Sequence, residues 1–462
     1  MGFAKILHYN ENTDEILSAA GRISTMDGTA TEIYQKSVDA GITANQKLIS
    51  KVMSSGHTST LEHASVNIAF EDVSVLFEQF LIEFRLMSFT VKSRRYVNFS
   101  KAGYFDALDI QDGEAHRIFS EAVENKFAVY DKLVAAGVPV EDARFVLPYC
   151  FCSNILCTVN CRELIRLMNE LVYGRGSRFP EFVAIGESLF AQVAKFAPYL
   201  ECRKPLDYCR GDFNGIGVLT NGICAEYDFE KLPEVTVMND VSAAADIILR
   251  AGLMESGMSP LSAIEISDTK KQEIFTMMLN TPRKRALEQA NFTLLFKGMS
   301  LAAITHMTRH RMQSLVTPNF KIALSHILNG GEASYVRPES IYKNDATRAI
   351  YEEAFAEESK AIAALREYEV YDELYYLLLA GTKVPVMTTM NANELDTFFR
   401  LRCCNRAQWE IREYAMAALK ELREECPVLF NLYGASCSLN GKCPEGRMCC
   451  GKPWVGGNPS NK

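Results

Sequence analysis

The sequence repeats one pattern twice, and this repeat constrains the fold more strongly than any other feature of the chain. Residues 60–70 match residues 285–296, and residues 158–164 match residues 389–395. The matched stretches keep the same order in both halves. Two ordered sets of matches are most simply explained by a duplicated structural unit. We therefore expect two copies of one fold, joined by a boundary near residues 225–233.

Each copy is expected to combine strands with long helices. It opens with a short strand, followed by an amphipathic helix that ends near a glycine, which is a frequent helix stop. The first matched stretches alternate polar and apolar side chains up to Phe70 and Phe296, as a strand with one buried face does. This mixture predicts an α/β or α+β fold. Helical periodicity with a charged outer face runs through residues 116–136, 181–197, 343–367 and 405–425.

The composition restricts the classes of function. The 462 residues are enough for two to four domains. A net charge of -8 argues against a general nucleic-acid binder, which usually carries a basic excess, although it leaves room for a local cationic pocket. The sequence has no apolar run long enough to span a bilayer, and its first residues lack the apolar core of a signal peptide. We expect a cytoplasmic protein without nucleic-acid or membrane partners.

One motif is divided between the two copies. The first copy keeps a Ser-x-Arg-Tyr sequence at residues 93–96, here called the tail. The second copy keeps an Arg-His-Arg sequence at residues 309–311, here called the head, where the first copy has Glu-Phe-Arg at residues 83–85. In both copies the last Arg of this triplet, Arg85 or Arg311, is followed by a Ser three residues later. Losses in complementary places predict a composite site, with one half-site from each copy.

These residues resemble the signature of the flavin-dependent thymidylate synthases. The head and Ser314 resemble the start of that signature, and the tail resembles its end. Residues 56–63 resemble the family's flavin-contacting stretch, and residues 407–412 resemble its late helix. The resemblance covers most of both halves. Several motifs that recur in the same order are more specific than any one of them alone.

The resemblance implies a fold and an assembly. Each copy would form a mainly antiparallel sheet with long helices, and the two copies would form an intrachain pseudo-dimer. The first copy would span residues 1–225, the second 234–432, and a cysteine-rich tail 433–462. Family members are homotetramers with sites built between subunits. A homodimer of this two-copy chain would imitate that arrangement.

The resemblance also implies a reaction. The family converts dUMP to dTMP with methylenetetrahydrofolate as carbon donor, FAD as hydride carrier and NADPH as reductant. Nucleotide binding would fall to Ser93, Arg95 and Arg144 of the first copy and to Arg309 and Arg402 of the second, because bidentate guanidinium groups suit phosphate. Arg402 would stabilise negative charge that develops on the uracil carbonyl, with Arg309 as the second catalytic residue. Flavin contacts would come from His57, Ser59, Asn160, Arg162, Arg309, His310, Arg311 and Asn391.

The motif residues that each copy keeps differ in their expected role. Residues of the nucleotide side survive in the first copy, and those of the head side survive in the second. The counterpart of Arg144 is about Tyr375, and that of Arg402 is Leu171. A glutamine expected before the head is His306. The alternatives are flavin-dependent modification of another pyrimidine nucleotide, or a non-catalytic paralogue that binds nucleotide or flavin. For single residues, the alternative roles are structural ion pairs for the arginines and helix caps for the asparagines.

Fourteen cysteines are many for a cytosolic protein. In a reducing compartment such clusters are more often metal ligands or buried thiols than disulfides. Four thiols in a glycine-rich stretch could enclose one Zn or an iron–sulfur cluster, although their spacing is not Cys-x2-Cys. The alternative is reduced thiols. The four candidate ligands are Cys437, Cys443, Cys449 and Cys450.

Overall fold

The computed structural model describes residues 2–108, 113–208, 234–261, 265–317, 321–328 and 334–452. The chain divides into two compact units. Unit 1 comprises Met1–Ala225, His326–Ala333 and Arg337–Ala380. Unit 2 comprises Glu226–Ser325, Ser334–Val336 and Gly381–Lys462. Within the described ranges, no helix is both long and apolar enough to cross a membrane.

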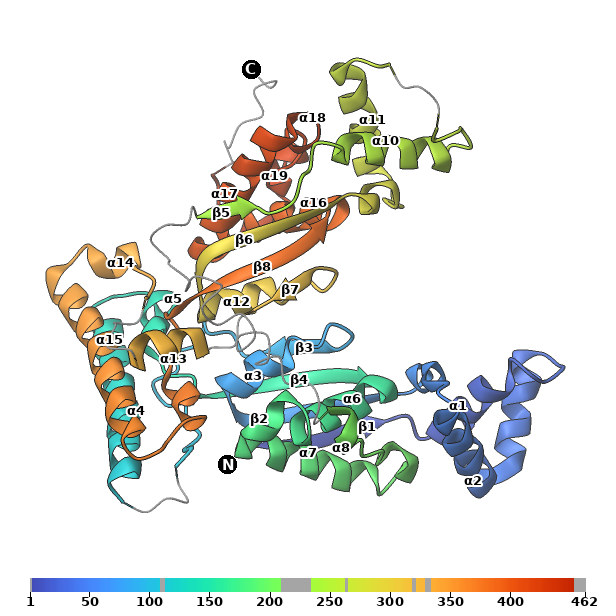
Figure 1. The fold of residues 1–462 in the computed structure, drawn as a ribbon, viewed down its shortest axis with the longest axis horizontal. Coiled ribbons are helices and arrows are strands. Elements are labelled where there is room, and N and C mark those ends of the chain that lie inside the picture. The colour runs from blue at the N-terminus through green and yellow to red at the C-terminus, as the bar shows by residue number, and fades with distance from the viewer. Residues whose placement is uncertain are drawn as a thin grey trace, which may run out of the picture. The chain divides into compact units, whose positions relative to one another are not determined.

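The sheet of unit 1 is antiparallel and has the strand order β1-β2-β4-β3 (Figure 1). Alternate side chains of β2 are buried, as the sequence pattern predicts for a strand with one face on the core. The helix that follows β4 packs with α7, and Phe182 of α7 meets Phe77 of α3 edge to face, with ring centroids 5.2 Å apart. The elements are β1 (Phe3–Tyr9), α1 (Thr13–Arg22), α2 (Ala30–Ser54), η1 (Thr58–His63), β2 (Ser65–Ser74), α3 (Val75–Leu81), β3 (Ser88–Val91), α4 (Glu114–Ala135), α5 (Val140–Ala143), η2 (Arg144–Val146), β4 (Cys152–Asn160), α6 (Cys161–Val172), η3 (Arg175–Arg178), α7 (Pro180–Val193), η4 (Pro198–Leu200) and α8 (Pro205–Tyr208).

Unit 2 repeats this sheet with the order β5-β6-β8-β7. Its central strands even repeat a local irregularity, because the register shifts between Phe296 and Met299 as it does between Phe70 and Val73 of unit 1. The prediction of two copies with mainly antiparallel sheets is therefore confirmed. The elements of the second half of the chain are β5 (Val235–Val237), α10 (Ala244–Glu255), α11 (Asp268–Asn280), η5 (Ala286–Gln289), β6 (Asn291–Ser300), α12 (Leu301–Met307), β7 (Ser314–Val316), α13 (Lys321–Leu328), α14 (Glu339–Tyr342), α15 (Asp345–Arg366), η6 (Glu373–Leu377), β8 (Lys383–Asn391), α16 (Ala392–Arg402), α17 (Trp409–Glu425), α18 (Pro427–Phe430), α19 (Ser436–Leu439) and η7 (Gly446–Met448).

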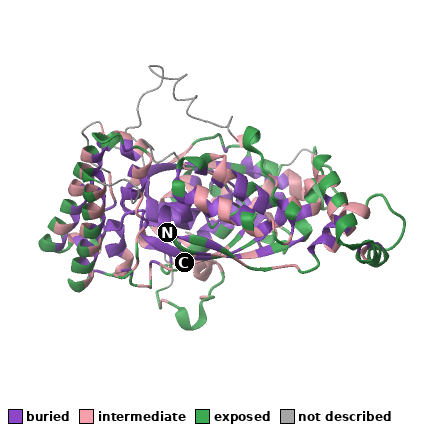
Figure 2. Ribbon diagram, turned by 90° about the horizontal axis from the view of Figure 1, so that it is seen from below, coloured by how far each residue is buried: buried purple, intermediate pink, exposed green. Residues whose placement is uncertain are grey.

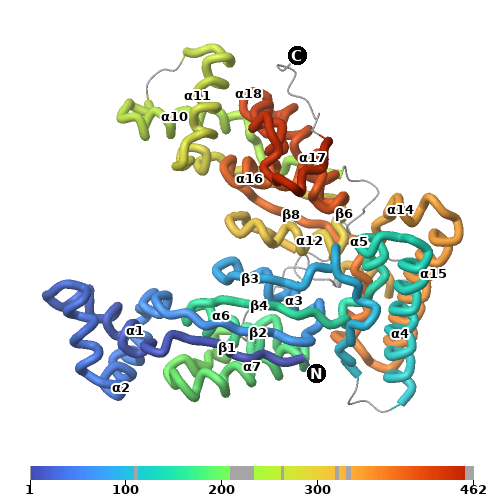
Figure 3. Tube along the Cα trace, turned by 180° about the vertical axis from the view of Figure 1, so that it is seen from behind, coloured from blue at the N-terminus to red at the C-terminus, as the bar shows by residue number. Residues whose placement is uncertain are grey.

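One part of the second copy belongs to unit 1. Helices α14 and α15 and the turn η6 lie within Arg337–Ala380, and α15 packs along α4 of the first copy (Figure 3). Backbone hydrogen bonds join the two copies nearby, from Tyr149 N to the Leu378 oxygen and from Ala380 N to the Leu147 oxygen, both 2.9 Å. Unit 1 thus contains packing between the two copies, as the expected pseudo-dimer requires.

A buried carboxylate fixes the helix that leads to the motif in each copy. Ser74 caps α3, and its backbone N and hydroxyl both donate to Glu181 of α7, at 2.7 and 2.6 Å. Ser300 caps α12 and donates in the same way to Glu410 of α17, at 2.7 and 2.5 Å. All residues of α3 and α12 are buried, and Figure 2 colours the whole chain by burial. Each cap therefore fixes where a motif begins.

Candidate functional site

The head forms a turn between α12 and β7 of unit 2, and its histidine is buried. Nδ1 of His310 lies 3.3 Å from a carboxylate oxygen of Glu394, and Nε2 accepts a 2.9 Å hydrogen bond from Nε of Arg402. Because an arginine can only donate, Nε2 carries no proton and Nδ1 carries it. Burial is the main cause that lowers the pKa of His310. A neutral imidazole therefore links an acid to a guanidinium.

Helix α16 supplies both partners of this histidine. Glu394 and Arg402 lie eight residues apart, a little over two helical turns, so they project from the same side of α16. A second bond runs from Nη2 of Arg402 to the backbone oxygen of His306, 3.0 Å away. Arg309 and Arg311 on either side of the histidine are exposed. We call these residues, Arg309, His310, Arg311, Glu394 and Arg402, the head cluster.

The turn of the head is held by a residue that the motif comparison did not single out. Gln313 is buried, and its amide nitrogen donates to the Met307 oxygen at the end of α12. Its amide oxygen accepts from the hydroxyl of Thr388 on β8, 2.7 Å away. The first copy has Met87 and Cys157 at these positions, and neither can make that bond. The sequence signal that could have indicated this bond is that Gln313 and Thr388 occur together in the second copy, whereas the first copy lacks both.

The tail forms a second cluster, in unit 1. The side chain of Arg95 pairs with the carboxylate of Glu141, and Nε of Arg144 donates to the backbone oxygen of the same residue, 2.9 Å away. The hydroxyl of Ser93 accepts from the backbone N of Arg95, at 3.3 Å. The three predicted nucleotide-binding residues therefore converge, and with Glu141 we call them the tail cluster. Arg144 is only 3% exposed, so its guanidinium group is buried.

The residue inside the Ser-x-Arg motif anchors the tail. Arg94 forms a buried ion pair with Glu78 of α3, 2.7 Å long, and Glu78 also accepts from the hydroxyl of Ser153, 2.6 Å away. The second copy has Ile304 at the position of Glu78 and Phe320 at that of Arg94. An ion pair in one copy thus corresponds to two apolar residues in the other. Sequence comparison missed this pair because the motif leaves its middle position open.

The predicted flavin contacts of the first copy lie where strands meet helices, at η1 before β2 and at the junction of β4 with α6. His57 and Ser59 are exposed beside η1, and Arg162 pairs with Glu62. Asn160 caps α6 by accepting from Glu163 N at 2.9 Å, and Asn391 caps α16 by accepting from Glu394 N at the same distance. The two asparagines therefore have a structural role as caps. Their flavin contacts stay predictions.

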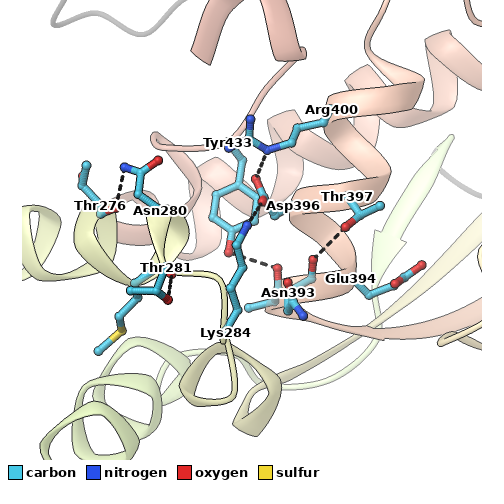
Figure 4. Close-up of polar contacts among 12 residues, drawn as sticks. Thr276, Asn280, Thr281, Lys284, Asn393, Glu394, Asp396, Thr397, Arg400 and Tyr433 are labelled. Atoms are coloured by element: carbon cyan, nitrogen blue, oxygen red, sulfur yellow. Dashed lines mark hydrogen bonds and ion pairs between the residues drawn. The ribbon is translucent and has the colours of Figure 1, made fainter. Parts of the chain in front are cut away.

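The second copy has Arg283 and Arg285 in place of His57 and Ser59. Basic side chains around them form ion pairs with acidic residues of the same copy (Figure 4). Lys284 between them pairs with Asp396 of α16 at 2.8 Å, and Arg400 pairs with the other oxygen of Asp396 at 2.8 Å. Arg285 pairs with Glu288. Asp396 is 2% exposed, so it fixes the stretch before η5 to α16.

Two positions in unit 1 correspond to cluster arginines of the other copy but hold other residues, Glu83 and Tyr375. Both contact arginines of unit 1. Glu83, which replaces the leading arginine of a head, pairs with Arg175 at 3.0 Å. Tyr375, which replaces the buried arginine of a tail, lies under the guanidinium of Arg178, 5.2 Å from its ring centroid. Arg178 also pairs with Asp372. Arg175 and Arg178 thus form ion pairs and a cation–π contact within unit 1.

The part of the cysteine-rich tail that the structure describes does not show the predicted metal site. Among the described residues, no group of three or more His, Cys, Asp or Glu side chains could hold a metal ion. Cys437 lies on α19, whereas the sulfur of Cys450 accepts from the amide of Asn405 at 3.7 Å and bonds with Lys452. Cys443 forms a side-chain hydrogen bond with Cys449, but the four thiols do not form one ligand set. Cys209 and Cys224 lie outside the described residues.

Comparison with known proteins gives a consistent result. The family model of the thymidylate synthase complementing proteins matches residues 5–199 and again residues 236–428. A flavin-dependent thymidylate synthase of Clostridium tetani is 30% identical over 207 residues, which cover 41% of this chain and 81% of the relative. The enzyme of the same name from Geobacter sulfurreducens is 31% identical over 214 residues, covering 46% and 90%.

A solved structure also resembles part of the chain. It is that of the UMP/dUMP methylase PolB from Streptomyces cacaoi bound with 5-Br dUMP, and the match has a TM-score of 0.35 and 22% sequence identity. It covers 44% of this chain and 93% of that protein.

Proposed function

Because the chain belongs to the thymidylate synthase complementing protein family and carries two copies of its domain, we propose that it is a flavin-dependent enzyme that methylates dUMP to dTMP. Methylenetetrahydrofolate would supply the carbon and NADPH the electrons. The observation that carries the proposal is the hydrogen bond between Arg402 and His310. It joins two residues, 92 positions apart, that the motifs assigned to the same site.

The tail cluster suits the phosphate of the nucleotide. Two guanidinium groups, from Arg95 and Arg144, both contact Glu141, one at its carboxylate and the other at its backbone oxygen. A phosphate monoester carries close to two negative charges at neutral pH, and arginine binds it in a bidentate fork. The Ser93 hydroxyl adds one more donor. Glu141 would hold Arg95 in place until the phosphate takes over that pairing.

The head cluster suits the reacting end of the nucleotide and the flavin. Bound FAD would supply hydride transfer, which no side chain can perform. The exposed guanidinium groups of Arg309 and Arg311 fit an anionic reduced flavin, because arginine keeps its charge at any working pH. Arg402, aligned by His310 and the His306 oxygen, would stabilise negative charge on the pyrimidine carbonyl. The neutral His310 adds no competing charge beside it.

We further propose that the head cluster and the tail cluster serve a single reaction, so that one chain contributes one of each. A homodimer would then contain four copies of the domain, in imitation of the family's tetramer. Light scattering on the purified protein tests this assembly. A mass about twice the chain mass of 51.7 kDa is expected.

Anaerobic turnover tests the function. The purified protein is supplied with FAD, dUMP, methylenetetrahydrofolate and NADPH, and dTMP is measured by chromatography. Formation of dTMP is the expected result. Bound FAD without dTMP would reject the reaction, and the same assay with other pyrimidine nucleotides then tests the nearest alternative. A colourless protein that takes up no FAD would leave only the non-catalytic binding paralogue.

A further inference from the structure

Helices α4 and α15 are equivalent elements of the two copies. Each is followed by a residue with positive φ, Gly137 and Glu369, which lie 232 positions apart. Adding 232 to six of the seven buried positions of α4 gives a buried position of α15. The same helix, with the same buried face, therefore occurs once in each copy. The six matched pairs are Ala115 and Thr347, Phe119 and Tyr351, Val123 and Phe355, Lys126 and Glu358, Tyr130 and Ile362, and Leu133 and Leu365.

The two helices meet near their own equivalent positions. Asn125 and Glu357 are also 232 positions apart, and the amide of Asn125 donates to the carboxylate of Glu357 at 2.6 Å. Equivalent residues of two copies contact each other only close to a two-fold axis. Pro148 and Leu379 are joined by an antiparallel bridge. They are 231 positions apart, the offset of Asn160 and Asn391 at the ends of β4 and β8, so this equivalent pair supports the same local axis. Unit 1 therefore contains the pseudo-symmetric contact of the two copies (Figure 3).

The charges at this axis differ between the copies. Lys126 is 3% exposed, and its amino group lies 2.9 Å from the carboxylate of Glu357. Its equivalent, Glu358, is 2% exposed and accepts from Leu379 N at 2.9 Å. The first copy thus presents Asn-Lys at the axis, and the second presents Glu-Glu. A buried ammonium group requires an acidic partner, and only the second copy supplies one here.

Pairing of a copy with its own kind would lose this match. Two first copies would place Lys126 beside Asn125, the equivalent of its present partner Glu357, so the buried ammonium group would lose its acid. Two second copies would bring Glu357 against Glu357, beside two buried Glu358 side chains and without a cation. A buried ammonium group without an acid, and two Glu357 carboxylates that meet at the axis, both oppose association, which is how interfaces reject wrong partners.

We infer that the α4/α15 interface selects the pairing of the first copy with the second and rejects the pairing of either copy with its own kind. The partner that this surface fits is therefore the other half of the duplicated chain. The inference is independent of the proposed reaction. It rests on the contact between Asn125 and Glu357 and on the ion pair of Lys126 with Glu357.

Exchange of the two dipeptides in the full-length chain tests this inference. One variant carries Asn125→Glu with Lys126→Glu, and so has Glu-Glu in both copies. A second carries Glu357→Asn with Glu358→Lys, and so has Asn-Lys in both copies. A third carries all four changes and restores opposite partners in reversed places. The urea midpoint of each variant is followed by circular dichroism.

The two variants with the same dipeptide in both copies should unfold at lower urea than the wild type, and the exchanged variant should recover most of that loss. Recovery of folded protein only in the exchanged variant is an equally supportive result. Lys132→Glu and Glu353→Lys reverse exposed charges on the same helices and serve as matched controls with little expected effect. The inference is overturned if a same-dipeptide variant matches the wild type, or if the exchanged variant is no more stable than the worse of the two.

Discussion

At the scale of single residues, His310 shows how the fold uses a group that it keeps uncharged. Burial lowers its pKa from the ordinary value of 6.5, so the folded protein favours the neutral ring. The unfolded chain then binds more protons between the lowered value and 6.5, and the free energy of unfolding falls as pH falls through that window. Protonation would also remove the acceptor that Arg402 uses.

His310→Phe tests this role, because phenylalanine is the residue that the first copy has at this position. The difference in thermal midpoint between wild type and variant should shrink as pH is lowered below about 6.5, where the wild type alone loses stability from this group. At neutral pH the variant should retain nucleotide binding and lose turnover. A midpoint difference that is constant with pH would contradict a histidine held neutral in the wild type.

Glu141 permits a sharper test of the tail cluster, because its two contacts use different atoms. Glu141→Gln removes the carboxylate that pairs with Arg95 but keeps the backbone oxygen that receives Arg144. Affinity for dUMP should stay the same or rise. Arg95→Ala should lower it by about tenfold or more, since a hydrogen bond to a charged group contributes roughly 1.5–3 kcal/mol. Calorimetric titration measures both, and weaker binding in Glu141→Gln would show that the carboxylate is not a competitor.

At the scale of elements, the serine caps connect the sheet to the head. Ser300→Ala removes a hydroxyl that caps α12 and bonds the buried Glu410. The expected loss of stability is about 2–3 kcal/mol, because a cap and a bond to a buried acid are both lost. Ser74→Ala is the matched control in the first copy and should cost about as much. Only Ser300→Ala should weaken FAD binding, measured by flavin fluorescence. Equal FAD affinity in both variants would separate the cap from the head.

The elements also show what sequence could and could not predict. The two copies of one fold were predicted from residues that repeat along the chain, such as the stretches that end at Phe70 and Phe296. The order of the strands in each sheet was not predicted. The bond between Gln313 and Thr388 and the pair of Arg94 with Glu78 were missed because they vary between the copies. The placement of α15 in unit 1 was also beyond reach. Matching the two copies along the sequence shows which segments are equivalent. It does not show which helix faces pack together in the folded chain.

At the scale of the whole molecule, duplication without divergence would give two equal nucleotide sites per chain. Divergence has instead removed one set of arginines. Where the second copy would need the counterpart of Arg144 it has Tyr375, which packs under Arg178, and Asp372 pairs with the same arginine. Those contacts hold acidic and aromatic groups at the positions where a phosphate would need cations. We therefore expect no second nucleotide site around Arg178, where these contacts lie within unit 1.

The stoichiometry of nucleotide binding follows from this asymmetry. Titration of the intact protein with dUMP should give one nucleotide per chain, because only the tail cluster of the first copy keeps Arg95 and Arg144 together. Arg144→Ala should abolish that single binding event, whereas Tyr375→Phe should leave both its affinity and its stoichiometry unchanged. Two nucleotides per chain, or a residual event of unchanged affinity in Arg144→Ala, would mean that the positions around Arg178 still bind nucleotide. In that case the copies would share the substrate-binding role and the division of labour between them would be wrong.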